Sequence, residues 1–290
     1  WEFSKGVDYT FPEGVTIDAG GYLVVCGDRE LFSEFYPDAE AYGVFEKSLD
    51  NGGETLTLKN ADGKKVDSVK YDDRAPWATS ADGYSASLER ICPTASGKHV
   101  ANWAPSILSD DYDRQASGTP GQQNSTYAAS VPPAIESVTF SPQVSKPNET
   151  ISVIATITEA DAKVELCYRV VAPGEEGEES VISMKHRERS EYTATIPGTD
   201  ANRIVRFRVR ATNKQGDARY YPHQNAIRPA FSVYVKGESE PGTIAVAQFF
   251  NVGKDEFREG ADYRRSHAQS RSRGRGGFGD FGRRRESKED

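Results

Sequence analysis

The stretch Ile204-Val-Arg-Phe-Arg-Val-Arg-Ala-Thr212 alternates apolar residues with arginines from Val205 to Ala211. Successive side chains of an extended strand point to opposite faces of a sheet. One face would therefore hold the apolar residues Val205, Phe207, Val209 and Ala211, and the other the cations Arg206, Arg208 and Arg210. This parity predicts a strand of an antiparallel sheet, with one face in a core and the other in water.

Six more strand-like segments lie on either side of this stretch. They are residues 135–140, 150–157, 164–170, 180–184, 192–196 and 231–235. Seven short strands in about 100 residues are typical of an immunoglobulin-like or fibronectin-like β-sandwich. Residues 135–238 are therefore predicted to form one such domain.

Residues 1–127 contain shorter strand-like segments separated by turn-forming residues. The clearest hairpin runs from Thr55–Lys59 through Asn60-Ala-Asp-Gly63 to 66–71. Alternation fails between Val66 and Val69, which predicts a bulge in the return strand. Apolar spacing before Pro37 predicts one helical turn over 29–36, and further strands are expected at 22–26 and 85–91.

Two composition changes divide the chain. Residues 117–134 are rich in Gly, Pro, Ser and Thr, which places a linker at 128–134. Residues 264–290 hold nine Arg or Lys and four Asp or Glu, and they show no strand periodicity. Residues 239–290 are therefore expected to form a flexible, largely disordered Arg/Gly-rich tail.

Overall composition excludes some classes of protein. The 290 residues carry 36 basic and 44 acidic side chains, so the net charge of −8 argues against a globular nucleic-acid binder. The longest apolar stretch, residues 243–250, is far below the ~18 residues of a membrane span. The chain begins at Trp1, and its single methionine is Met184, so we expect a fragment. The absence of an export signal is therefore uninformative, because removal or truncation would both erase it.

The first 124 residues carry an ordered series of short motifs. They include the run from Gly6 to Val25, Leu49-Asp-Asn-Gly-Gly-Glu-Thr-Leu-Thr-Leu58, Ser87-Leu-Glu-Arg90, Asn102-Trp103 and Gly118-Thr-Pro-Gly121. Their order and spacing resemble the lamin-tail domain, an immunoglobulin-like module that also occurs in many exported bacterial proteins. The resemblance implies that the first strands of the module are missing and that one sheet edge is open.

The same resemblance implies a secreted or cell-envelope setting. The bacterial members of the family share no set of catalytic residues that could be assigned to positions of this chain. Some related exported proteins continue into a spore-coat protein H (CotH) type kinase domain. We find no Gly-rich phosphate loop followed by a lysine strand here, so any such domain would lie beyond Asp290. The predicted fold is all-β, with two tandem immunoglobulin-like β-sandwiches followed by the tail.

Three functions are weighed. The favoured hypothesis is a non-enzymatic extracellular or cell-envelope adhesion and scaffold region, whose partner is a protein or glycan at the cell surface. The second is the accessory N-terminal region of an exported CotH-type kinase or another secreted enzyme. The third is association with RNA through the single Arg275-Gly-Gly and neighbouring arginines, which the interspersed acids disfavour. No cofactor and no catalytic residue are predicted.

Two candidate binding sites follow from residue type. Arg206, Arg208 and Arg210 would present three guanidinium groups to an anionic glycan or to carboxylates of a partner. The favoured alternative is ordinary cross-strand pairing, with Glu165 and Arg169 on the neighbouring strand. Asp110, Asp111 and Asp113 are a weak calcium candidate, and a solvated acidic turn is the favoured interpretation.

The remaining polar motifs are interpreted as structural. The acidic run Glu175-Glu-Gly-Glu-Glu179 is expected to be an exposed hairpin loop. Cys26, Cys92 and Cys167 are interpreted as isolated thiols, with a Cys26–Cys92 disulfide left open for an exported chain. Asn124-Ser-Thr126 and Asn148-Glu-Thr150 are glycosylation acceptor strings, relevant in a eukaryotic secretory pathway.

Overall fold

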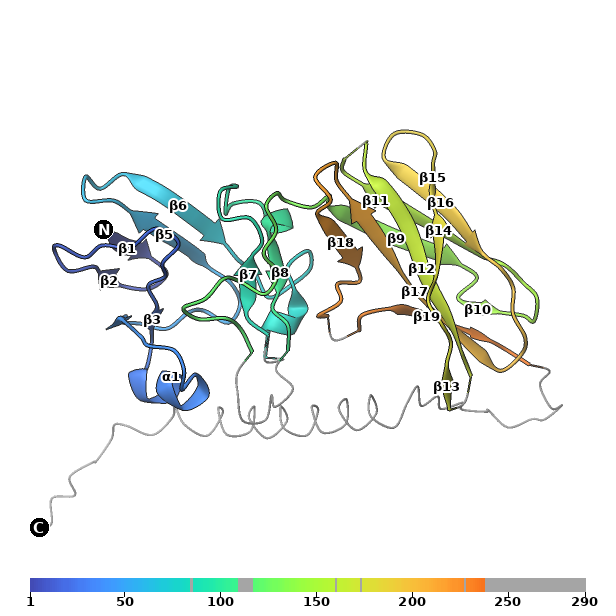
Figure 1. Ribbon diagram of the computed structural model, residues 1–290, viewed down its shortest axis with the longest axis horizontal. Helices are drawn as coiled ribbons and strands as arrows, with labels where there is room; N and C mark the ends of the chain where they lie inside the picture. Colours follow the sequence, from blue (N-terminus) through green and yellow to red (C-terminus); the bar gives the residue numbers. More distant parts are fainter. Residues whose placement is uncertain (84–85, 109–116, 160, 173, 227, 238–290) are drawn as a thin grey trace, which may run out of the picture.

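The computed structural model describes residues 1–83, 86–108, 117–159, 161–172, 174–226 and 228–237. Within these ranges the chain is built of β-strands in several sheets, with one α-helix, α1 (Arg29–Phe35) (Figure 1). The predicted all-β class is confirmed. The predicted tail, 239–290, and the calcium candidate Asp110, Asp111 and Asp113 lie outside the described residues.

Residues 135–235 form two facing sheets. The larger has the order β10-β19-β17-β12-β13, with β14 also paired to β12 and β18 to β17. Its strands are β10 (Val144–Ser145), β12 (Lys163–Ala172), β13 (Glu175–Glu176), β14 (Ser180–Ser183), β17 (Arg203–Thr212), β18 (Ala218–Tyr221) and β19 (Phe231–Val235). The smaller has the order β15-β16-β11-β9, with β9 (Ile135–Ser141), β11 (Ile151–Ile157), β15 (Lys185–His186) and β16 (Glu191–Ile196).

The core of this unit lies between the two sheets. Phe207 of β17 is 1% exposed and makes an edge contact with Phe140 of β9, the ring centroids being 5.1 Å apart. Val205, Val209 and Ala211 are buried beside it, opposite the alternating residues Ile151, Val153, Ala155 and Ile157 of β11. The predicted inward face of residues 204–212 is confirmed, because every second residue enters the core.

The first unit contains smaller sheets. One sheet has the order β2-β1-β5-β6, and two strand pairs, β3-β4 and β7-β8, lie outside it. The strands are β1 (Glu2–Lys5), β2 (Tyr9–Thr10), β3 (Val25–Cys26), β4 (Gly43–Val44), β5 (Thr55–Lys59), β6 (Lys65–Lys70), β7 (Leu88–Arg90) and β8 (Trp103–Pro105), with 3-10 turns at η1 (Thr79–Ala81) and η2 (Val100–Asn102).

The predicted hairpin of the first unit is present as β5 and β6. The Asn60 side chain accepts hydrogen bonds from the backbone N–H groups of Asp62 and Lys64, and Gly63 takes a positive φ of 73°. Leu58 lies opposite Asp67 and Lys59 opposite Lys65, so Val66 is the extra residue of a bulge. The predicted bulge is therefore confirmed in the return strand.

Two buried polar side chains hold the last loops of the first unit onto β7. Glu89, 3% exposed, accepts hydrogen bonds from the hydroxyls of Thr119 (2.8 Å) and Ser125 (2.7 Å) and from the Thr126 N–H (3.1 Å). Asn102, 0% exposed, accepts from the Cys92 N–H and donates to the Cys92 carbonyl. Short motifs that lie far apart in the sequence are thus bonded to one another.

Several expectations for the first unit are corrected. The strand expected at 22–26 is limited to β3, because Tyr22 lies exposed after a Gly-Gly turn and only Val25 and Cys26 find a partner strand in β4. Cys26 and Cys92 are separate buried thiols, so the disulfide left open does not form. The Cys26 Sγ faces the Gly43 carbonyl, whereas the Cys92 Sγ faces Thr94 and Ala129.

Candidate functional site

The predicted arginine stripe forms one side of the larger sheet. We call Arg169, Arg206, Arg208 and Arg210 the arginine face. The antiparallel register places Glu165 opposite Arg210, Cys167 opposite Arg208 and Arg169 opposite Arg206. Because the core residues of β17 take the other parity, these side chains lie on the outer side of the sheet.

The cross-strand pair of Glu165 and Arg210 is closely bonded. The Arg210 Nε and Nη2 lie 3.0 and 2.8 Å from one Glu165 carboxylate oxygen, and Lys163 Nζ lies 2.8 Å from the other. Glu165 is only 6% exposed. Burial opposes its ionisation, but the hydrogen bonds from Lys163 and Arg210 prevail and lower the pKa of Glu165. The expected pairing of Glu165 with the stripe is found.

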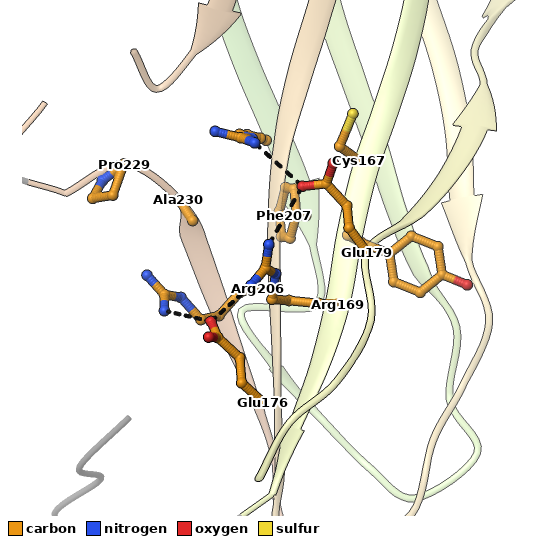
Figure 2. A pocket seen from close by; sticks show the side chains of 10 residues that line it. Cys167, Arg169, Glu176, Glu179, Arg206, Phe207, Pro229 and Ala230 are labelled. Atoms are coloured by element: carbon orange, nitrogen blue, oxygen red, sulfur yellow. Dashed lines mark hydrogen bonds and ion pairs between the residues drawn. The ribbon is translucent and has the colours of Figure 1, made fainter. Parts of the chain in front are cut away.

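The acidic segment 175–179 lies against the other three arginines (Figure 2). Glu176 Oε1 is 2.9 Å from Arg169 Nη1 and 3.7 Å from Arg206 Nη1. Glu179 Oε2 is 3.3 Å from Arg208 Nη2 and 3.7 Å from Arg169 Nη2. Each carboxylate therefore bridges two guanidinium groups.

This geometry adds to one expectation and corrects another. The segment 175–179 is an exposed part of a hairpin, as predicted, and the pairing of β13 with β12 also brings Glu176 over the cations. Arg169 does not pair directly with the stripe, since it lies opposite Arg206, another cation. The two positive charges are held together by Glu176, which contacts both.

Three residues of the arginine face, Arg169, Arg206 and Arg208, line a shallow hollow of about 170 Å³. Its walls also include Cys167, Phe207 and Pro229. The ring of Tyr220 lies beneath Arg208, with the guanidinium carbon 4.3 Å from the ring centroid. Burial raises the pKa of the Cys167 thiol, which is therefore held in its protonated, weakly nucleophilic form. The hollow suits ionic contact rather than covalent chemistry, and its own carboxylates already meet the arginines.

A second polar site lies where the two units meet, and we call it the joint. Asp217, in the turn between β17 and β18, accepts hydrogen bonds from the Ser130 N–H (2.9 Å) and hydroxyl (2.5 Å). The Asn213 amide donates to the Ser130 hydroxyl at 2.7 Å. Ser130, in the middle of the predicted linker 128–134, is thus bonded to the second unit.

The second unit also contacts the first directly at the joint. The Arg219 guanidinium, from β18, donates to the Ala101 carbonyl, and the Asn225 amide donates to the Pro105 carbonyl at 3.0 Å. Figure 1 shows β18 on the side of the second unit that faces β7 and β8. The second unit is therefore hydrogen-bonded both to the linker and to the first unit.

The joint encloses a hollow of about 240 Å³ lined by Arg219, His223, Asp217 and residues of both units. Burial lowers the pKa of Arg219 to about 10. Burial and then the neighbouring Arg219 charge lower the pKa of His223 to about 4. His223 Nδ1 accepts from the Asn225 N–H at 3.2 Å, so the neutral ring carries its proton on Nε2.

The low pKa of His223 predicts a loss of stability on mild acidification. Below pH 6.5, the ordinary pKa of histidine, the unfolded chain binds a proton at His223 that the folded chain does not bind until about pH 4. The free energy of unfolding should therefore fall by about 1.4 kcal/mol for each pH unit between these two values. Urea unfolding between pH 6.5 and 5 measures the slope.

The variant His223→Gln should flatten that slope, whereas His99→Gln, at an exposed position, should leave it unchanged. If the free energy of unfolding has the same pH slope in the unaltered protein and in His223→Gln, the imidazole of His223 is not kept neutral by burial. The chosen range lies above the pH at which Glu165, with its lowered pKa, takes up a proton.

Sequence reasoning identified the arginine face but missed the joint. Arg206, Arg208 and Arg210 lie together as predicted, and the structure adds Glu176 and Glu179 to them. Arg219 was missed because β18 has only four residues. The signal was the turn-forming run Asn213-Lys-Gln-Gly-Asp217, which follows a regular strand and marks a hairpin with a return strand.

The remaining predictions concern a metal site, a membrane span and the family. In the part of the chain that is described, no three His, Cys, Asp or Glu side chains gather as a metal site. Within the same ranges, no helix is long and apolar enough to cross a membrane. No protein-family model and no curated protein sequence matches the chain, so the lamin-tail resemblance stays a prediction.

Proposed function

We propose that this chain is a non-catalytic binding and scaffold region of an extracellular or cell-envelope protein. The observation that carries the proposal is the joint. Two β-units in one chain are expected to move relative to each other unless their contact holds them. Here Asp217, Asn213 and Arg219 bond the second unit to the linker and to the first unit, which supports a fixed pair of recognition surfaces.

The arginine face supports recognition rather than catalysis. Its charged groups are bound to one another, and its one thiol, Cys167, is buried and protonated. The resemblance of the first unit to a module of exported bacterial proteins supports the extracellular setting. The proposed partner is a protein or a glycan of a cell surface, bound through geometry and hydrogen bonds.

A binding array tests the proposal. The full chain is applied to cell-envelope glycans and to immobilised surface peptides, with and without a divalent-metal chelator. We expect binding to at least one class that survives chelation. Absence of binding on every array, or steady turnover of a small compound by the purified chain, would overturn the proposal.

The role of the joint has its own test. Asp217→Ala removes the acceptor of both hydrogen bonds from Ser130, so small-angle scattering should show a broader range of distances between the units. Binding to array targets that touch both units should weaken at least severalfold. Asp200→Ala, at an exposed position, is the matched control and should change neither measurement. An unaltered scattering profile in Asp217→Ala would show that the joint does not fix the units.

A further inference from the structure

We propose that the hollow of the joint is a binding site for one carboxylate group, supplied by an acidic side chain of a protein partner. The inference rests on the proposed function, because it assigns a ligand chemistry to a chain proposed to bind a surface partner. It concerns Arg219 and His223, which the sequence patterns did not single out.

The first argument is charge. Among the described residues, Arg219 pairs with no carboxylate, and its bonded partner is the neutral Ala101 carbonyl. Its pKa is lowered by burial alone, so no neighbouring anion stabilises the guanidinium. Asp217 lines the same hollow, but its bonded oxygen faces Ser130. A partly buried cation without a counter-ion gains more from an incoming carboxylate than an exposed one does.

The second argument is the set of donors around that charge. His223 accepts at Nδ1 from Asn225, which leaves Nε2–H as its donor. Gln224 adds an exposed side-chain amide to the same lining. A carboxylate accepts hydrogen bonds through two oxygens and donates none when ionised, so it matches a guanidinium next to further N–H donors.

The third argument is size and surroundings. At about 240 Å³ the hollow is smaller than the roughly 300–1,000 Å³ of sites that enclose a drug-sized ligand. One Asp or Glu side chain fits such a volume better than a sugar chain does. Ile91, Ala104 and Pro132 are the apolar part of the lining, and an ionic contact is stronger beside apolar groups than in bulk water. These features favour a protein partner that inserts a single acidic side chain.

Titration by NMR tests the site in the full chain. The probe is the blocked peptide acetyl-Gly-Gly-Asp-Gly-Gly-amide, and the same peptide with Asn in place of Asp is its neutral control. We expect saturable shifts of the Arg219 Nε–H and His223 ring signals with the Asp peptide only. The pKa of His223 should rise when that peptide is bound, since a carboxylate favours imidazolium.

Variants separate the site from general attraction by charge. Arg219→Gln should bind the Asp peptide at least about tenfold more weakly, as loss of a charged hydrogen bond predicts. Arg187→Gln, at an exposed position, should bind it unchanged. Arg219→Gln also loses the hydrogen bond to the Ala101 carbonyl, so its thermal midpoint is measured beside its binding. If that midpoint falls, Arg219→Lys, which keeps the charge without the planar fork, should still bind more weakly.

Several results would overturn the inference. They are equal shifts with the Asp and Asn peptides, full binding by Arg219→Gln and Arg219→Lys, or no shift at all. Tighter binding of glucuronate than of the Asp peptide would reject the protein partner. If array binding persists in Arg219→Gln, the carboxylate site is rejected and the proposed function stands. If the unaltered chain binds nothing on the arrays, the proposed function itself is rejected.

Discussion

Replacing Asn102 with alanine should lower the free energy of unfolding of the first unit by about 2–3 kcal/mol. The side chain is fully buried, accepts from the Cys92 N–H at 2.8 Å and donates to the Cys92 carbonyl at 2.9 Å. Weaker bonds at 3.4 and 3.3 Å reach the carbonyls of Ala95 and Ser96. Alanine would leave the buried Cys92 N–H without a partner, which costs about 1–3 kcal/mol. The Cys92 carbonyl keeps a hydrogen bond from the Ala95 N–H, and the Ala95 carbonyl keeps one from Arg90.

Urea unfolding followed by tryptophan fluorescence measures this effect. Trp77 and Trp103 lie in the same region, with ring centroids 6.3 Å apart, so their emission reports on the loops that Asn102 holds. Asn51→Ala, at an exposed turn position, is the matched control and should change stability by less than about 0.5 kcal/mol. A loss below about 1 kcal/mol for Asn102→Ala would mean that water replaces the side chain.

Phe207→Ala should destabilise the second unit by about 3–5 kcal/mol, the usual cost of removing a buried aromatic ring. The ring is 1% exposed and contacts both Phe140 and Phe231, with centroid distances of 5.1 and 5.4 Å. Its removal would leave a cavity between the two sheets, because Phe207 is packed among the buried β17 residues Val205 and Val209 and the facing residues of β11.

Amide hydrogen exchange measures this change, since all three tryptophans lie in the first unit. Exchange of the β12 and β17 amides should accelerate by the factor that the lost stability gives. Val181→Ala, at an exposed position of β14, should leave those rates unchanged. Similar rates in the two variants would show that the second unit does not depend on the ring for its core.

The strands of the second unit were predictable because side-chain parity is a local property. In Ile204–Thr212 the order of residues alone predicts which side chains face the core. The structure places Phe207 in the core, as that order requires. The hairpin around Asn60 was predictable for the same reason. Its Asn and Gly supply the bonds and the positive φ of the turn within five residues.

The candidate sites were less predictable because they depend on contacts between distant segments. Glu176 meets Arg206 only because β13 extends β12 at the edge of the sheet. Arg219 bonds to Ala101, which is 118 positions away in the sequence, and no local sequence pattern predicts that contact. The acidic run 175–179 is exposed as expected, but repulsion within a segment does not reveal the arginines that Glu176 and Glu179 contact after folding.

Glu89 has a practical consequence for dividing the protein into parts. Its carboxylate is buried, and its donors come from Thr119, Ser125 and Thr126, at the end of the first unit. A shortened chain that stops at Gly118 would keep every strand of that unit but lose all of those donors and the segment that lies on Glu89. An expression boundary for the isolated first unit therefore belongs after Thr126, and one that ends before it should yield insoluble material.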